Sequence, residues 1–168
     1  LVAARTELAD QTVRTYCIAK GVAVAVNPVP VADLFAAAAI DIGMVVHLSR
    51  IFALPLSRND AGKLVRVIST EALALMGTVW AVHFISSALK VGTGGLSTML
   101  TAGGQGAVAY YATYVVGQVT RQYLAQGCSW GDAGPKQVVD DILRSLDRDS
   151  VLRMARDDIR ARLKRAGG

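Results

Sequence analysis

The sequence predicts an all-α fold of helical hairpins or a bundle, associated with a membrane and followed by a basic amphipathic helical tail. The chain of 168 residues is 52% hydrophobic and only 18% charged, and its apolar residues are mainly Ala, Val, Leu and Ile. No segment shows the strict alternation of apolar and polar residues that is typical of a half-buried strand. The composition also excludes a disordered chain, which requires low hydrophobicity and high charge.

Long segments of low charge alternate with basic connectors. Residues 21–49 carry only two aspartates, residues 67–89 carry only one glutamate, and residues 91–120 carry no charge. A bilayer-spanning helix needs about 20 mostly apolar residues, and segments 67–89 and 97–120 are long enough. We therefore expect a membrane hairpin over these two segments, with a soluble bundle around a buried Ala-rich core as the alternative.

The first half of the chain predicts two helices separated by a proline break. An amphipathic helix is expected from residue 4 through the apolar stretch that ends at Asn27-Pro28, because proline removes a hydrogen-bond donor and disfavours helix in the preceding residue. Asp33 is placed to cap the next helix, which we expect to end near Phe52.

A third helix is expected from a cap at Ser57 or Asn59 to about Lys90. The glycine-rich connector 92–95 is so short that the following helix, about 97–125, must run antiparallel to the third. Small residues four positions apart in this helix indicate close packing, either within the domain or across a dimer seam. The pairs are Ala102 with Gly106, Gly103 with Ala107, and Ala109 with Thr113.

We divide the chain into an apolar, membrane-associated domain over residues 1–125 and a C-terminal part over residues 126–168. The second part is expected to form a loop and two short amphipathic helices. Pro135 suits the first position of one helix, and Asp147 or Asp149 can cap the other.

The last predicted helix carries a row of cations that we take as candidate membrane or partner contacts. The row can be a solvated face paired with Asp157 and Asp158, a contact with anionic lipid, or a contact with an acidic partner. Nucleic acid is not an expected partner, because no aromatic stacking platform or reading helix accompanies the cations. The row consists of Arg153, Arg156, Arg160 and Lys164.

No catalytic motif occurs in the sequence. It lacks the lysine-containing phosphate loop, the Gly-x-Ser-x-Gly elbow and the HExxH zinc motif. Cys17 and Cys128 cannot build a disulfide framework, and they do not combine with His47 or His83 in any zinc-site spacing. We therefore expect no enzymatic activity, no cofactor and no metal.

Asp33 and Asp41 are candidate buried polar residues, because they are the only charges in segment 21–49. In the simpler interpretation Asp33 is a helix cap and Asp41 is the partner of a nearby arginine or backbone group. The alternative is a proton or cation site inside the bundle, as in a small transport protein.

Several motifs in a fixed order carry a family resemblance. They are Asn27-Pro28-Val29-Pro30 with Asp33, the run from Leu48 to Ser57, and Gly103–Gly106 followed by Tyr114, Gly117 and Tyr123. Together they resemble the helical domain of unknown function found C-terminal to bacterial, especially cyanobacterial, Era-like small GTPase domains. That family includes the YcjF-type inner-membrane proteins. The resemblance covers about residues 15–125, and residues 126–164 look like the cyanobacterial branch.

The resemblance implies a non-catalytic module that accompanies a GTPase on the cytoplasmic face of an inner or thylakoid membrane. Membrane lipids and a GTPase domain are the implied partners, and a homo-oligomer is possible. The chain has neither a phosphate loop nor a guanine-reading Asn-Lys-x-Asp motif, so the GTPase domain is expected upstream or in a separate chain. A start without Met fits an excised C-terminal portion. The alternative function is a soluble all-helical protein–protein interaction or dimerisation module.

Overall fold

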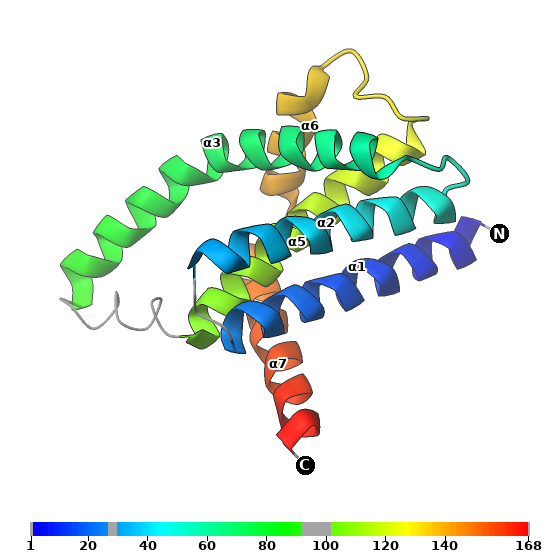
Figure 1. The fold of residues 1–168 in the computed structure, drawn as a ribbon. Helices are drawn as coiled ribbons and strands as arrows, with labels where there is room; N and C mark the ends of the chain where they lie inside the picture. The colour runs from blue at the N-terminus through cyan, green and yellow to red at the C-terminus, as the bar shows by residue number, and fades with distance from the viewer. Residues whose placement is uncertain (1, 27–29, 92–101, 168) are drawn as a thin grey trace.

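The computed structural model describes residues 2–26, 30–91 and 102–167, and it describes side chains over residues 2–26, 38–77 and 106–167. Within these ranges the regular secondary structure is entirely helical, which confirms the predicted all-α class. Figure 1 shows the arrangement of the helices. They are α1 (Val2–Val26), α2 (Pro30–Ile51), α3 (Arg58–Val91), α5 (Ala102–Ala125), α6 (Gly134–Ser145) and α7 (Arg148–Gly167).

The helices form a bundle crossed by the C-terminal helix. Helices α1 and α2 lie side by side, the first half of α3 packs beside α2, and α5 packs along α1 (Figure 1). The chain reverses direction between α3 and α5, as the sequence predicts for this pair (Figure 1). Helix α7 crosses α1 and α5 and then projects beyond them to the C-terminus (Figure 1).

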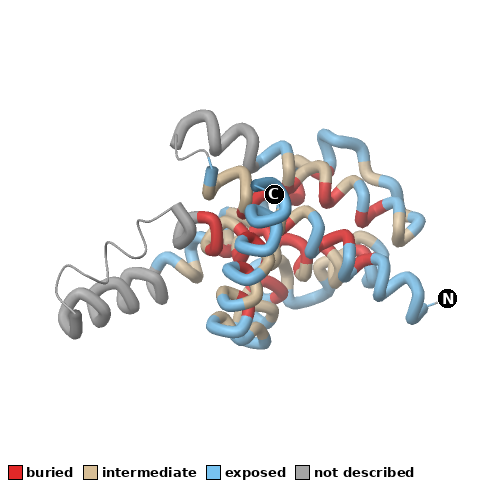
Figure 2. The backbone as a smooth tube through the Cα atoms, turned by 90° about the horizontal axis from the view of Figure 1, so that it is seen from below, coloured by how far each residue is buried: buried red, intermediate tan, exposed pale blue. Residues whose placement is uncertain are grey.

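One apolar core joins the bundle to the C-terminal helices. Figure 2 shows the buried stretches gathered in the middle of the molecule, with the N-terminus and the end of α7 exposed. Tyr110 of α5 is fully buried, and Val139 of α6 and Ala155 of α7 belong to the same core cluster. Helix α5 ends at Ala125, and the helices beyond it pack back onto the bundle.

Two of the predicted helix caps are present. The hydroxyl of Ser57 accepts a hydrogen bond from the backbone N–H of Asp60 at 3.1 Å. The carboxylate of Asp147 accepts bonds from the backbone N–H and the hydroxyl of Ser150, at 3.5 Å and 2.7 Å. Both side chains thus satisfy donors that a helix start leaves unpaired.

The predicted cap at Asp33 is wrong. Helix α2 begins at Pro30, so Asp33 lies inside its first turn rather than before it. The fixed φ of proline suits the first helical position, where its missing N–H costs no intrahelical bond. The side chain of Asp33 lies outside the described residues.

Glycines allow α1 and α5 to pack closely. A Cβ atom at Gly117 would lie 2.7 Å from Cγ1 of Val13, and one at Gly106 would lie 2.7 Å from the carbonyl oxygen of Gly21. Close packing of the small residues within the chain is therefore confirmed at Gly106, which belonged to the predicted pairs.

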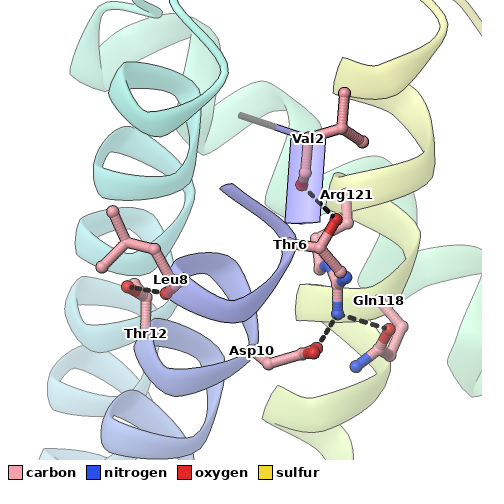
Figure 3. Close-up of polar contacts among 7 residues, drawn as sticks. All are labelled: Val2, Thr6, Leu8, Asp10, Thr12, Gln118 and Arg121. Carbon is pink, nitrogen blue, oxygen red and sulfur yellow. Dashed lines mark hydrogen bonds and ion pairs between the residues drawn. The ribbon is translucent and has the colours of Figure 1, made fainter. Parts of the chain in front are cut away.

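A polar contact through Arg121 also joins α1 and α5. The guanidinium of Arg121 in α5 donates to the carboxylate of Asp10 in α1 and, at 3.4 Å, to the side-chain oxygen of Gln118 (Figure 3). Two threonine hydroxyls of α1 bond backbone carbonyl oxygens one turn earlier, Thr6 to Val2 and Thr12 to Leu8 (Figure 3). Because these hydroxyls bond within α1, this polar contact between α1 and α5 is made by Arg121 instead.

No helix, over the part of the chain that the structure describes, is long and apolar enough to cross a membrane. The structure therefore gives no support to spanning helices in segments 67–89 and 97–120. The side chains of residues 78–105, which make up much of both segments, lie outside the described residues. The connector between α3 and α5 lies outside the described residues.

Candidate functional site

Helix α7 presents its predicted row of cations to solvent. Arg153, Arg156, Arg160 and Lys164 are all exposed, whereas the buried residues of α7 lie on its other side. Over the described residues, no hydrogen bond or ion pair engages these four side chains. Their spacing of three or four residues places them on one face of the helix. The row is therefore a cationic face without fixed internal partners.

Asp158 does not pair with this row, contrary to one interpretation of the sequence. Its carboxylate forms a two-pronged pair with Arg14 of α1, with Nη2–Oδ1 at 2.6 Å and Nε–Oδ2 at 3.0 Å. The hydroxyl of Tyr110 in α5 donates to the same Oδ2 at 2.7 Å. This cluster, which we call the Asp158 latch, joins α7 to both α1 and α5.

The latch favours the ionised carboxylate. Partial burial of Asp158 opposes ionisation, but the hydrogen bonds from Arg14 and Tyr110 outweigh it and lower the pKa of the carboxyl below its ordinary value. Burial, together with the bond to Asp158, raises the pKa of the Tyr110 hydroxyl, which therefore stays a donor. Both pKa shifts correspond to the same arrangement, in which Asp158 is ionised and the hydroxyl of Tyr110 keeps its proton and donates to it.

A groove of about 440 Å³ lies between α1 and α7, next to the latch. Its α1 side carries the polar side chains of Arg14 and Thr15 as well as the apolar ones of Ile18, Ala19 and Val22. Its α7 side carries Arg162 and Arg165, neither of which was among the predicted contact residues. The groove thus combines apolar and cationic side chains.

Asp41 lies in a buried network with a lysine that the sequence analysis did not select. Its Oδ2 accepts a bond from Nζ of Lys20 at 2.7 Å, and its Oδ1 accepts one from the hydroxyl of Thr113 at 2.7 Å. The two charged side chains are only 10% and 7% exposed. Asp41 is thus a buried, paired carboxylate, but its partners are Lys20 and Thr113 and not the arginine or backbone group expected from the sequence.

The same network bears on the alternative of a cation site. The ammonium group of Lys20 already supplies the positive charge beside the carboxylate of Asp41. A paired and hydrogen-bonded carboxylate is the ordinary form of a buried charge. The side chain of Asp33, the other residue of that hypothesis, lies outside the described residues.

The imidazoles and thiols form no shared site in the described part. Nδ1 of His47 lies 3.5 Å from the hydroxyl of Tyr16, and the two rings meet edge to face. Cys17 is buried and Cys128 is partly exposed, and both are free thiols. Over the described residues, no three metal-ligating side chains lie together. His83 lies outside the described side chains.

Comparison with known families identifies the family of the chain. The family model of the domain of unknown function DUF697 matches residues 1–148. The chain belongs to the DUF697 family. No curated protein and no solved structure matches it. The DUF697 match ends at the first residue of α7, so the cationic face, Asp158 of the latch, and Arg162 and Arg165 of the groove all lie beyond it.

Local sequence signals could have found part of this site. Arg162 and Arg165 are three residues apart and fall outside the spacing of the row, so their separate face follows from helical spacing alone. Lys20 is the last cation before the charge-poor segment that holds Asp41, which is a signal for a pair. No local signal identifies Arg14 as the partner of Asp158, 144 residues away.

Proposed function

We propose that this DUF697 chain is a non-catalytic helical module that attaches a GTPase to the cytoplasmic face of a bacterial inner or thylakoid membrane. The resemblance to domains that follow Era-like GTPases supports the GTPase partner, which would lie upstream in the same polypeptide or in a separate chain. Membership of DUF697 agrees with the domain part of that resemblance.

The cationic face of α7 is the observation that carries the membrane part of the proposal. A basic residue near an anionic membrane surface contributes about 1 kcal/mol to binding, so four residues contribute about 4 kcal/mol, close to a thousandfold in affinity. The four side chains have no fixed internal partner among the described residues and are exposed, so lipid headgroups can approach them directly. Such contact with the membrane surface requires no spanning helix.

Flotation of the purified chain with lipid vesicles tests this proposal. Wild type is expected to float with phosphatidylglycerol vesicles and to stay behind with phosphatidylcholine vesicles, and binding should fall as salt rises. The variant Arg156→Gln/Arg160→Gln/Lys164→Gln is expected to bind about 100-fold more weakly, at about 1 kcal/mol for each charge. A sodium carbonate wash then separates surface attachment from integration.

A control variant with the same change in net charge isolates the face from the total charge. Arg58→Gln/Lys63→Gln/Arg66→Gln removes three exposed cations from the first turns of α3. The proposal requires this variant to keep most of the vesicle affinity. The proposal is contradicted if both triple variants lose vesicle affinity equally, or if wild type does not bind anionic vesicles. A non-binding chain that forms dimers in light scattering would favour the interaction-module alternative.

A further inference from the structure

The groove between α1 and α7 has an excess of positive charge. Arg14, Arg162 and Arg165 line it, together with one carboxylate, that of Asp158. Both oxygens of Asp158 are already bonded by Arg14 and Tyr110. The charges of Arg162 and Arg165 are therefore left uncompensated within the groove, where no hydrogen bond or ion pair among the described residues engages them.

These two arginines are separate from the cationic face of α7. Arg162 is two residues from both Arg160 and Lys164, and residues two apart on a helix do not face each other. Arg162 and Arg165 are three apart and share the side that borders α1. Two planar guanidinium groups on one helix side suit an oxyanion such as a phosphate, which arginine binds through paired hydrogen bonds.

Three of the five α1 residues that line the groove are apolar. Ile18, Ala19 and Val22 lie on one side of α1, and Ala161 of α7 adds a small apolar surface beside the arginines. No charged residue follows Lys20 in α1, and Val26 at its end is 61% exposed. A free phosphate would leave this apolar surface uncovered, whereas an amphiphile covers it with hydrocarbon while its anionic group contacts the arginines.

The size of the groove fits part of such a molecule. Pockets for small ligands occupy about 300–1,000 Å³, and the groove has about 440 Å³. From the charge, the apolar side and the volume, we infer that this groove binds the phosphate headgroup and adjoining hydrocarbon of an anionic phospholipid. Arg162 and Arg165 hold the phosphate, and Ile18 and Val22 contact the hydrocarbon. The inference rests on the proposed function in that a membrane supplies the lipid.

Titration with dihexanoyl-phosphatidylglycerol below its micelle concentration tests the groove without any membrane. The full chain with labelled Ile and Val methyl groups is followed by NMR, and the methyl signals of Ile18 and Val22 are expected to shift. Arg162→Gln/Arg165→Gln is expected to weaken binding about tenfold or more, since charge-assisted hydrogen bonds are lost. The control Arg58→Gln/Lys63→Gln removes the same charge from α3 and should bind as wild type does.

Two further ligands separate the lipid from other sources of the same chemistry. Glycerol phosphate, which has no acyl chains, should bind far more weakly than the short-chain lipid, and dihexanoyl-phosphatidylcholine should bind weakly for lack of net negative charge. Equal binding of glycerol phosphate and the lipid would overturn the inference in favour of a free-anion site. Absence of lipid binding to wild type, or equal loss in the control variant, would also overturn it.

The outcome is independent of the vesicle experiment. If the short-chain lipid fails to bind while wild type still floats with anionic vesicles, the groove inference fails and the cationic face stands. If the short-chain lipid binds but the chain does not bind anionic vesicles, the proposed membrane attachment fails instead. Arg162→Gln/Arg165→Gln should keep the wild-type thermal midpoint, since both residues are exposed and no internal bond engages them among the described residues.

Discussion

Replacement of Asp41 by Asn is expected to destabilise the fold strongly. The carboxylate of Asp41 in α2 joins Lys20 in α1 to Thr113 in α5, with both contacts at 2.7 Å. Asp41→Asn keeps the size of the side chain and an oxygen for the hydroxyl of Thr113. It removes the negative charge and leaves the ammonium of Lys20, whose side chain is 10% exposed, without a counter-charge.

The expected magnitude follows from the burial of both partners. Removing one member of a buried ion pair costs about 3–5 kcal/mol, because an uncompensated charge stays in a poorly solvated site. A domain is stable by about 5–15 kcal/mol in total, so Asp41→Asn should remove a large share of the stability. Lys20→Met/Asp41→Leu removes both charges and should recover most of the loss, except for about 1–3 kcal/mol from the unpaired hydroxyl of Thr113.

Urea unfolding at neutral pH, followed by circular dichroism, measures these free energies. Asp140→Asn is the control, because Asp140 pairs with the 79% exposed side chain of Arg144 one turn away. Such a surface pair contributes about 0.3–0.5 kcal/mol. A loss for Asp41→Asn below about 1 kcal/mol would refute the buried network. The network would also be refuted if the stability loss of Lys20→Met/Asp41→Leu equalled the sum of the losses of the single variants Lys20→Met and Asp41→Leu, since residues in one network do not act additively.

Three further outcomes follow from local geometry. Gly117→Ala should cost about 1–3 kcal/mol in thermal unfolding because its new Cβ would clash with a valine of α1, whereas Gly77→Ala, with no atom within 4 Å, should be neutral or stabilising by up to about 1 kcal/mol. The lowered pKa of Asp158 means that its stabilisation is present above the unfolded-state pKa of about 4 and is lost as pH falls through the lower folded value. Asp158→Asn should flatten that acid part of the stability curve, and an unchanged curve would contradict the latch. Burial raises the pKa of the Cys17 thiol, so a thiol reagent should modify partly exposed Cys128 in the folded chain and Cys17 only in denaturant.

Helix positions could be predicted because their signals are local. The caps at Ser57 and Asp147 depend on a hydroxyl or carboxylate within three residues of the donor, so the sequence contains both partners side by side. The cationic row of α7 depends on spacing along one helix. The error at Asp33 has the same origin, since Asp33 and Pro30 are both acceptable helix starts and the sequence does not rank them.

A low density of charge does not by itself identify the surroundings of a helix. Segments 67–89 and 97–120 are poor in charge, and many of their residues are Ala, Gly, Ser and Thr, which are small and only weakly apolar. In the described part, such residues serve close helix contacts, as at Gly106 and Gly117 against α1. In α5 the low density of charge goes with burial, whereas Leu73 in the charge-poor part of α3 is 73% exposed. The choice between protein and lipid as the surrounding medium depends on hydropathy.

Contacts between distant helices could not be predicted, because they depend on how the helices cross. Asp158 selects Arg14 over the cations on its own helix because α7 crosses α1 at that point. The same crossing places Arg162 and Arg165 beside the apolar side of α1, while the cationic row stays exposed. Loss of the contacts of Asp158 with Arg14 and Tyr110 would thus remove the groove but leave the cationic face intact. Under the proposed function, attachment to an anionic surface depends on α7 alone, whereas the inferred selection of a lipid depends on α7 being docked against α1.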